Sequence, residues 1–554
     1  MRKAIASALV LALLLALVGC GANKQTEPET TQPTQTGTMD ISGKYPLDET
    51  RNEAIVNDAG TVTVANEGNN RLFYHIFVGS FSDSDGDGLG DLRGIIERFD
   101  YLNDGDDNSG LSLGVEGIWL SPIFISPSYH KYDASDYYTI DPKFGTMEDL
   151  CELIQLCHNR NVKIILDLVI NHSSTQHPWF KSFCEAQKNE QTNDYYYDFY
   201  TWTEKTTPGA TWYKIPGTEK YYEGNFSSQM PELNYDNPDV RQAMVDVAKY
   251  YLDLGVDGFR FDAAKYVYYG HEPENAEFWK WYMAELRAIK PDIYSVAEVW
   301  DSDAVTYPYF ASTNCFNFTL AQTGGWIAET ARAGDVNVLT NYMSLYIQNI
   351  QSYNPDAMPV VFIANHDTDR AAGFLTVASG QAKVAANLAI LMPGSTFIYY
   401  GEEIGMKGSR GGSNTDANRR LAMNWGDGDT VKDPVGADYS SGQTNGTVVE
   451  QKENGDSLYN HYKKLIQIRK ANPEIANGTY TPLKTDTKLG GFVSTWNSSS
   501  VVVLHNTTND AIQVDLATLT DLELTVIAGF AGVNGVTLEG TILTIGGQTS
   551  VVLK

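Results

Sequence analysis

Three acidic residues each stand at the end of a short apolar run. Asp262 ends Gly-Phe-Arg-Phe-Asp, Glu298 follows Ser-Val-Ala, and Asp367 ends Phe-Ile-Ala-Asn-His-Asp. Runs of this length and composition are typical of buried strands. Carboxylates gathered at one rim repel one another and separate their pKa values, so one pocket can hold an ionised nucleophile and a protonated acid. A single acidic residue at a strand end is most simply an exposed one. Three together, with Arg260 and His366 beside two of them, favour a catalytic site.

The elements that must position these residues alternate between strand and helix from residue 71 onward. Amphipathic stretches such as Met147–Arg160 and Val240–Leu254 separate eight apolar runs. The runs are Leu72–Phe81, Val115–Leu120, Val162–Ile170, Val256–Phe261, Ile293–Val299, Cys315–Leu320, Pro359–Ala364 and Thr396–Tyr400. This alternation predicts an α/β fold, the (β/α)8 or TIM barrel, in which chemistry takes place at the carboxyl ends of the strands.

A chain of 554 residues is too long for a single core. We expect the barrel over residues 67–172 and 233–478. The connection after the third strand is far too long for a loop, so residues 173–232 are interpreted as a small inserted domain. From residue 479 to residue 554 the apolar runs become short and β-branched, which predicts a C-terminal all-β sandwich.

The overall charge limits the partners. The formal net charge is -29, which argues against nucleic acid and against an anionic substrate, because both would be repelled. Aromatic residues make up 12% of the chain, more than a core requires, which fits a surface that stacks on flat, polyhydroxylated ligands. The five cysteines form no Cys-x-x-Cys pair, so the sequence carries no redox or zinc signature.

The N-terminus carries a targeting signal. Arg2 and Lys3 precede an apolar stretch over residues 4–18, which is short for a membrane span. The sequence Leu-Val-Gly-Cys that ends at Cys20 resembles a bacterial lipoprotein signal. That resemblance implies removal of residues 1–19, lipidation of Cys20 and an extracellular protein anchored at the cell surface. An ordinary signal peptide with an incidental cysteine is the alternative. Residues 20–66 are polar and are interpreted as a flexible tether.

Five sequence blocks resemble, in order, the signature blocks of the α-amylase family, glycoside hydrolase family 13. The resemblance covers about residues 70 to 480. The blocks are Asp-Leu-Val-Ile-Asn-His at 167–172, Met-Pro-Glu-Leu-Asn at 230–234, Gly-Phe-Arg-Phe-Asp at 258–262, Ala-Glu-Val-Trp at 297–300 and Asn-His-Asp at 365–367. No single block would establish the family, but five in order on the strands of an eightfold pattern make coincidence improbable.

The resemblance implies a role for each acidic residue. Asp262 would attack the anomeric carbon, and Arg260, on the same face of the strand, would keep it ionised. Glu298 would act as acid and then as base, with a pKa raised by apolar neighbours such as Trp300. Asp367 would hold the sugar hydroxyls as the ring flattens. Such a carboxylate pair, about 5–5.5 Å apart, gives retention of anomeric configuration.

Further residues match family positions that surround the scissile sugar. Tyr132 would be the stacking floor, His130, His172 and His366 would donate to hydroxyls, and Lys265 would lie on the leaving-group side. For a lone histidine or lysine a structural or solvated role is the simpler interpretation. Their positions within the family's motifs favour substrate binding.

Alternating carboxylates in one segment predict a calcium loop. Asp83, Asp85, Asp87 and Asp91 present oxygen ligands to a hard cation. The segment is not an EF-hand, because the residue at position twelve is a glycine. It resembles the calcium loop after the first strand in the oligo-1,6-glucosidase-like branch of the family. That resemblance implies structural Ca2+ held by these residues together with Leu89.

A second calcium site is left open by the sequence. Asn171 stands at the asparagine of the α-amylase site between the barrel and the inserted domain. However, Glu232 occupies a place often held by aspartate, and Tyr266 replaces a histidine that contributes its backbone carbonyl.

The subtype lies between two branches of the family. Exo-acting members carry an acidic residue three positions before the floor tyrosine, where this chain has Tyr129. An aromatic residue there fits an open cleft, so the resemblance implies an endo-acting α-amylase that cuts α-1,4 bonds in starch and maltodextrins. Trp300 would line the leaving-group side or serve as packing. We expect a monomer whose only membrane contact is the lipid anchor.

Three alternatives remain. The chain could be a 4-α-glucanotransferase, in which a sugar replaces water, or a neopullulanase or cyclomaltodextrinase. The alternative from another class is a surface lipoprotein that binds glucan without cutting it. A pure binder has no reason to retain all three acidic residues, and this chain has them.

Overall fold

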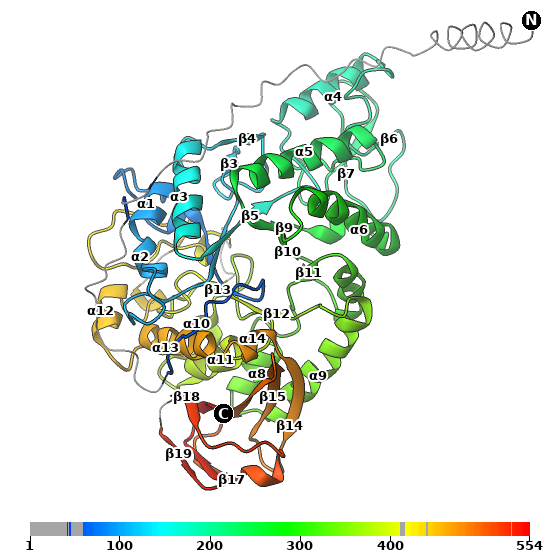
Figure 1. Cartoon of the computed structure of the whole chain (residues 1–554). Coiled ribbons are helices and arrows are strands. Elements are labelled where there is room, and N and C mark those ends of the chain that lie inside the picture. Colours follow the sequence, from blue (N-terminus) through cyan, green and yellow to red (C-terminus); the bar gives the residue numbers. More distant parts are fainter. Residues whose placement is uncertain (1–40, 42–43, 46–58, 410–415, 439–440, 533) are drawn as a thin grey trace, which may run out of the picture.

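Eight parallel strands form the centre of the molecule (Figure 1). The computed structural model describes residues 41, 44–45, 59–409, 416–438, 441–532 and 534–554. The strands are β1 (Leu72–Ile76), β2 (Gly117–Leu120), β5 (Lys163–Leu168), β9 (Gly258–Phe261), β10 (Tyr294–Ala297), β11 (Asn314–Cys315), β12 (Val360–Phe362) and β13 (Ser395–Tyr399). A parallel bridge between Phe316 and Val360 joins the two ends of the sheet and closes the barrel. The predicted (β/α)8 fold class is confirmed.

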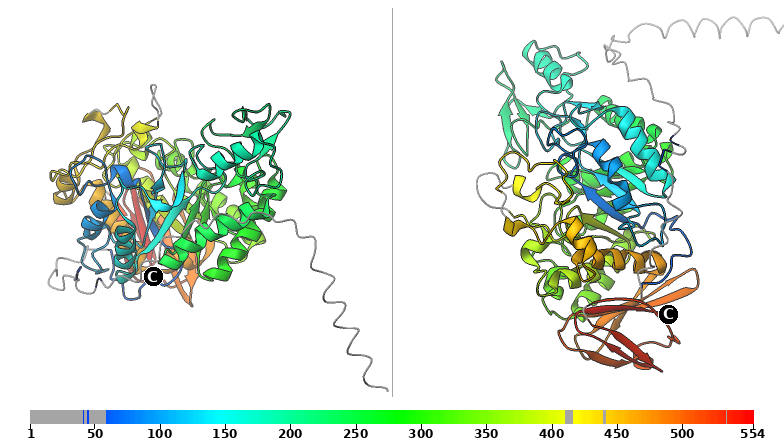
Figure 2. Two further views of the ribbon diagram at one scale, coloured as in Figure 1. Left: turned by 90° about the horizontal axis from the view of Figure 1, so that it is seen from above. Right: turned by 90° about the vertical axis from the view of Figure 1, so that its left-hand side faces the viewer.

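Helices cover the outside of the barrel (Figures 1 and 2). The longer ones are α3 (Met147–Asn159), α5 (Pro238–Leu254), α6 (Glu272–Ile289), α9 (Val336–Tyr353), α11 (Gln381–Ile390) and α13 (Leu458–Ala471). Local signals set their ends: Thr146 and Asp149 form a capping box at the start of α3, and Gly255, with a φ of 107°, ends α5. With helices outside and side chains inside, nearly every strand residue is buried, as parallel sheets require.

Aromatic side chains fill the barrel. Phe73, Tyr294, Phe316 and Phe397 pack in its interior, and Phe73 and Phe397 stack with ring centroids 4.7 Å apart. A Cβ atom at Gly117 would lie 2.4 Å from the Phe73 ring, so only glycine permits this packing. Side chains therefore fill the interior, and a site large enough for a substrate can form only where loops extend beyond the strand ends.

The segment inserted after β5 folds around its own aromatic residues. It contains α4 (Pro178–Lys188) and a three-stranded sheet of β6 (Trp202–Thr203), β7 (Trp212–Lys214) and β8 (Tyr221–Glu223). Phe180 contacts the rings of Tyr200 and Tyr222 edge-on. Many aromatic residues of this segment therefore form its core. Bridges from His172 to Glu232 and from Tyr200 to Leu233 fasten it at the barrel rim.

The C-terminal strands form two antiparallel sheets around a separate apolar core. One sheet contains β14 (Thr479–Lys484), β15 (Gly490–Trp496), β16 (Ser499–Asn506), β18 (Ile527–Gly532) and β21 (Thr549–Leu553), and the other contains β17 (Ile512–Asp515), β19 (Val536–Glu539) and β20 (Ile542–Ile545). This region and the inserted segment lie at opposite ends of the molecule (Figures 1 and 2).

Three local predictions differ from the structure. The first apolar run, Leu72–Phe81, is strand only at Leu72–Ile76 and then forms a short 3-10 helix at Val78–Ser80. Of the sixth apolar run, Cys315–Leu320, only Cys315 lies in a strand, β11 (Asn314–Cys315). The chain turns after Phe316, while Phe316 and Phe318 still pack into the barrel core. The end of the predicted flexible tether is packed: Ala59 is fully buried, and the backbone of Val62 bonds to the Asn108 side chain. Residues 1–19, Cys20 and most of the tether lie outside the described residues. Within the described ranges, no helix has the length and apolarity needed to cross a membrane.

Candidate active site

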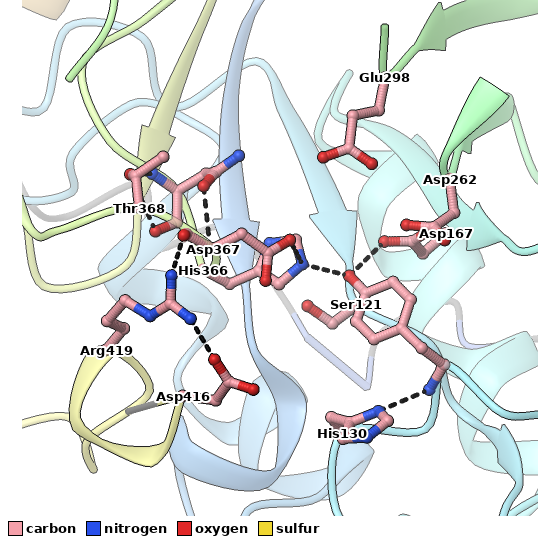
Figure 3. Close-up of polar contacts among 12 residues, drawn as sticks. Ser121, His130, Asp167, Asp262, Glu298, His366, Asp367, Thr368, Asp416 and Arg419 are labelled. Carbon is pink, nitrogen blue, oxygen red and sulfur yellow. Dashed lines mark hydrogen bonds and ion pairs between the residues drawn. The ribbon is translucent and has the colours of Figure 1, made fainter. Parts of the chain in front are cut away.

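The three acidic residues meet at one cavity beyond the carboxyl ends of the strands (Figure 3). Asp262 follows β9 directly, Glu298 follows β10 directly, and Asp367 lies on the loop after β12. All three line a cavity of about 620 Å³. The strand register therefore converts positions scattered over 106 residues of sequence, from 262 to 367, into one site.

A single guanidinium connects the two carboxylates expected to react. Nη1 of Arg260 lies 2.6 Å from Oδ1 of Asp262, and Nη2 lies 2.9 Å from Oε2 of Glu298. Arg260 is fully buried, so these ion pairs are strong and cannot easily relax into solvent. Two carboxylates that share one guanidinium are held within reach of the same bound sugar.

The environment of Glu298 suits an acid. Burial raises its pKa to about 8, and the negative charges of Asp262 and Asp367 act in the same direction, against Arg260. The backbone N–H of Ala263 donates to Oε2 at 3.1 Å, the same oxygen that Arg260 contacts. Oε1 is therefore the oxygen available to protonate a leaving group. Ala263 holds a left-handed φ of 42°, which is backbone strain at a position between the two carboxylates.

Asp167, which the sequence assigned only to a motif, is part of the same charge network. It is fully buried and accepts two contacts from Arg260 Nη1, at 2.8 and 3.0 Å, and one from the Tyr132 hydroxyl at 2.9 Å. Burial and the nearby charge of Asp262 raise the pKa of Asp167 to about 7, although Arg260 opposes this shift. Asp167 thus orients both the guanidinium and the floor tyrosine without touching the cavity.

Asp367 is the carboxylate held ionised. Burial alone would raise its pKa, but His366 at 2.9 Å and Arg420 at 2.8 Å hold the pKa of Asp367 well below its usual range. With 28% of its side chain exposed it is the most accessible of the three carboxylates, compared with 10% for Asp262 and 11% for Glu298. It can therefore accept hydrogen bonds from sugar hydroxyls.

The loop between β3 (Phe124–Ile125) and β4 (Asp136–Ile140) supplies the floor of the cavity. Tyr132 and His130 both line it, and the backbone N–H of Tyr132 donates to Nδ1 of His130 at 3.1 Å (Figure 3). His172 also lines the cavity and lies 3.2 Å from the Tyr132 carbonyl. Burial lowers the pKa of His130 to about 4, so the ring is neutral at pH 7.

Aromatic side chains surround the side of the cavity expected to hold the leaving group. Lys265 lines this side and donates to the carbonyl of Trp300 and to Asp301. The exposed Trp300 ring stacks on Phe318, with centroids 4.9 Å apart. Two other lining residues, Phe226 and Tyr266, contact each other, and Tyr266 stacks on Tyr269.

Two predicted substrate-binding residues lie behind the cavity wall. Arg260 and His366 are 0% exposed, and neither lines the cavity. His366 instead contacts Tyr132 at 2.6 Å and Asp367 at 2.9 Å through Nε2. The remaining predicted residues, which are Tyr132, His130, His172 and Lys265, all line the cavity.

A basic pair missed in the sequence completes the wall. Arg420 donates to Asp367, to the His366 carbonyl and to the Tyr129 hydroxyl, while Arg419 donates to the Asp367 carbonyl and to Asp416. The pair sits on the loop after β13, where no motif surrounds it. Two adjacent arginines among polar residues are the only signal in the sequence, and that signal is equally typical of a solvated loop.

The acidic loop at residues 83–91 fits a divalent cation. Carboxylate oxygens of Asp83, Asp85 and Asp91 lie within 4.8 Å of one another. Backbone N–H groups of the loop donate to Asp83, and those of Ser84 and Gly94 donate to Asp91, so the loop fixes the oxygens before any ion binds. Hard oxygen donors at this spacing are the ligands that Ca2+ prefers.

The second calcium position offers fewer donors. Oδ1 of Asn171 is buried without a protein partner, and its Nδ2 donates to Glu232 at 3.3 Å. Burial and the neighbouring Glu223 raise the pKa of Glu232 well above its usual range. A cation here would satisfy the Asn171 oxygen and keep Glu232 ionised, so these residues also fit an ion.

Comparison with known proteins agrees with this geometry. The family profile described as alpha amylase, catalytic domain, matches residues 75–478. The chain is 38% identical over 451 residues to "Alpha-amylase 3" of Dictyoglomus thermophilum, covering 79% of this chain and 84% of that protein. It is 31% identical to a "4-alpha-glucanotransferase" of Thermotoga neapolitana, covering 79% of this chain and 95% of that one. The solved structure of Eubacterium rectale Amy13B superposes with a TM-score of 0.82 at 34% identity, covering 88% of this chain and 96% of that one.

Proposed function

The chain belongs to the α-amylase family of glycoside hydrolases, and on this basis we propose that it is a retaining, endo-acting α-amylase. Its substrates would be the α-1,4-glucosidic bonds of starch and maltodextrins. The observation that carries the proposal is the contact of Asp262 and Glu298 with opposite nitrogens of Arg260 at one cavity wall. A nucleophile and an acid so close together favour direct attack on the sugar over attack through an intervening water.

In the first half of the reaction, Asp262 attacks the anomeric carbon and forms a glycosyl ester. The bond from that carbon to the glycosidic oxygen breaks while Glu298 gives its proton to the departing oxygen. The raised pKa of Glu298, about 8, keeps this proton in place at neutral pH. Asp367, which is held ionised, binds hydroxyls of the flattening ring.

In the second half, Glu298 acts as a base. Its carboxylate takes a proton from water, the water oxygen bonds to the anomeric carbon, and the ester bond to Asp262 breaks. Two inversions give net retention, and both carboxyls return to their initial protonation states. Arg260 supports each half, because it contacts whichever of the two is ionised.

Endo action is supported by Tyr129. The Arg420 guanidinium lies 5.7 Å from the Tyr129 ring centroid and donates to its hydroxyl at 3.1 Å. This arginine is therefore bound to an aromatic residue and to Asp367, with no carboxylate at position 129 to block the end of the cleft. A chain that extends past the reacting sugar can then be accommodated.

A 4-α-glucanotransferase activity is the second candidate. The cavity-lining rings of Trp300, Phe226 and Tyr266 offer stacking surfaces to an incoming sugar, and Phe318 and Tyr269 support two of them from behind. Stacking on these rings would favour a sugar over water as acceptor. Incubation with maltotriose separates the two: a glucanotransferase yields longer oligosaccharides with no net gain of reducing ends, whereas an α-amylase increases the reducing ends.

The acidic loop would hold Ca2+ through Asp83, Asp85, Asp87 and Asp91, with Leu89 contributing its carbonyl. The ion would neutralise the carboxylates and fix the loop, and it would take no part in bond cleavage.

The proposed location is the cell surface, with a lipid on Cys20. Starch is too large to enter a cell, so an enzyme that cuts it must act outside, which supports this location. The variant Cys20→Ser should move the protein from the membrane fraction to the medium.

The test of the proposed function is the release of reducing ends from soluble starch by the purified protein. The expected result is early formation of oligosaccharides of mixed length from amylose. No release under conditions in which the protein still binds starch would overturn the enzyme assignment in favour of a glucan-binding protein. Exclusive panose from pullulan would indicate a neopullulanase.

A further inference from the structure

A further histidine, His75, lies inside the barrel beneath the active site. His75 comes from β1 and is 1% exposed, inside the barrel. Its ring stacks on Trp119, its register partner on β2, with centroids 3.4 Å apart and planes 10° apart. Its Nε2 lies 2.9 Å from the hydroxyl of Ser121. No step of the proposed reaction uses His75.

His75 contacts the histidine that organises the cavity wall. The His75 and His366 rings meet edge to face, with centroids 5.1 Å apart and planes 83° apart, and Trp119 meets His366 in the same way at 5.8 Å. On its other side the His366 ring is parallel to the Tyr132 ring, with centroids 5.2 Å apart and an angle of 1° between the planes. The plane of His366 is therefore fixed between the floor tyrosine and the stacked pair of His75 and Trp119.

The contacts of His366 require one tautomer. Asp367 is held ionised and is an acceptor only, so the 2.9 Å contact with Nε2 of His366 requires a proton on Nε2. Burial lowers the pKa of His366, so the ring is neutral and Nδ1 carries a lone pair. The opposite tautomer would direct the Nε2 lone pair at the carboxylate and weaken the hold on Asp367.

Four buried nitrogen atoms in this layer have no protein partner. Nδ1 of His75, Nδ1 of His366, Nε1 of Trp119 and Nε of Arg260 are all buried and unbonded to the described residues. Trp119 and Arg260 can only donate, whereas a neutral histidine Nδ1 can accept. The residues are neighbours, since the Arg260 guanidinium lies 5.2 Å from the Trp119 ring. Two donors and two acceptors in one layer match an ordered water that joins them.

We propose that His75 is a positioning residue that fixes the ring plane and the tautomer of His366, by edge contact and through water shared between their Nδ1 atoms. With Nδ1 as its acceptor, His75 donates from Nε2 to the Ser121 hydroxyl, which can accept this hydrogen bond. The effect reaches the substrate through Tyr132 and Asp367, both bonded to His366. This inference rests on the proposed glycosidase function only for its effect on turnover.

A structural role for His75 is the competing explanation, and the C-terminal sandwich provides the control. His505 is also buried, and its Nδ1 lies 2.7 Å from the hydroxyl of Ser550. This second histidine and serine pair belongs to β16 and β21 and has no contact with the cavity. Substitution of His505 by phenylalanine should therefore lower stability without altering turnover.

The variant His75→Phe keeps a flat ring on Trp119 but removes both nitrogens. We expect its kcat on starch to fall 10- to 100-fold with a smaller change in KM, whereas His505→Phe keeps the wild-type kcat. His75→Gln, whose amide can both donate to Ser121 and accept from water, should recover part of the loss. Ser121→Ala offers a milder change should His75→Phe fail to fold.

The tautomer itself has a direct readout that does not depend on activity. The chain has nine histidines, so ¹⁵N-histidine labelling, with His366→Gln to assign the signal, reports which nitrogen of His366 is protonated. We expect Nε2–H alone in the wild type and a mixture of tautomers in His75→Phe or Ser121→Ala. An unchanged His366 signal together with an unchanged kcat in these folded variants would overturn the proposal. A wild type that fails to cleave starch but shows the expected tautomer change would overturn only the glycosidase function.

Discussion

The protein contains two buried clusters of acidic residues, each close to an arginine, and only one of them lines the cavity. Around Arg260 stand Asp262 and Glu298, and near Arg370 stand Glu402 and Glu403 on the turn after β13. Burial raises the pKa of Glu298 and of Glu402 to about 8 in both places. By this property alone the two clusters would be equal candidates for an active site.

The two clusters differ in the hydrogen-bond and ion-pair partners of their carboxyls and in the access of substrate to those carboxyls. Glu403 accepts hydrogen bonds from the hydroxyls of Tyr74 and Tyr101, and Glu402 accepts one from Tyr462, so tyrosines enclose these carboxyls. Glu298 contacts a guanidinium and lines the cavity. A raised pKa therefore reports burial, and catalysis requires in addition a charged partner and a path for substrate.

The largest expected effect is the loss of the nucleophile. Asp262→Asn should lower kcat on starch by about 10³-fold or more, because the covalent step is removed. Glu403→Gln, the matched change in the enclosed cluster, should keep wild-type kcat at a temperature where both proteins are folded. Reducing-end assays with circular dichroism as a folding check test both. Comparable losses in the two variants would remove the distinction between the clusters.

Substitution of Asp167 tests whether contact with Arg260 is enough to make a buried carboxylate essential for turnover. Asp167 is buried like Glu402 yet bonded to Arg260 and Tyr132. Asp167→Asn should lower kcat by about 10- to 100-fold, since the guanidinium and the floor tyrosine lose one anchor while both reacting carboxyls remain. Steady-state kinetics would measure it. A loss as large as that of Asp262→Asn would mean that Asp167 contributes to the chemistry itself.

The pH profile distinguishes the two raised pKa values. Glu298 must hold a proton to act as an acid, so kcat/KM should fall about tenfold per pH unit above pH about 8. Glu402→Gln should leave this alkaline limb in place. Rates at fixed low substrate between pH 6 and pH 10 measure the limb. Its disappearance in Glu402→Gln would transfer the titration to the enclosed cluster.

The pH dependence of the free energy of unfolding should report the titration of Glu402. Burial raises the pKa of Glu402 from its ordinary value of 4.5 to about 8, so between these pH values the unfolded chain ionises while the folded protein keeps the proton. The free energy of unfolding of the wild type should therefore fall as pH rises from 4.5 to 8, and Glu402→Gln should reduce that slope. Urea denaturation at three pH values would show it. An identical slope in the variant would contradict the assignment.

The smallest effect on turnover should come from the acidic loop, a third cluster in which Asp85 is exposed while Asp83 and Asp91 are largely buried. Removal of calcium with a chelator should lower the Tm by several degrees, because Asp83, Asp85 and Asp91 would then repel one another. Asp85→Asn should shift the Tm less than chelation and make it less dependent on calcium. Thermal unfolding with and without added Ca2+ provides the measurement. A wild-type Tm that does not respond to calcium would argue against metal at this loop.

Much of the site was predictable, because the strand patterns and motifs that identify its acidic residues are local features of the sequence. Strand patterns and motif order placed Asp262, Glu298 and Asp367 at strand ends, and eight strands imply that their ends share a rim. The arginines at 419 and 420 were not predictable, since their roles come from contacts made by a loop after the last strand. The same holds for His75, whose neighbours Trp119 and His366 are far from it in sequence.

The amino-acid order by itself determined the periodicities, and with them the barrel, the inserted segment and the C-terminal strands, because burial of one face depends only on local spacing. The tertiary structure decided which carboxyls share a guanidinium and which are enclosed by tyrosines. Charge, burial and solvent access act through space. Glu298 and Glu402 each follow a buried strand and have similar pKa values, and the folded structure alone makes one accessible to substrate and the other enclosed.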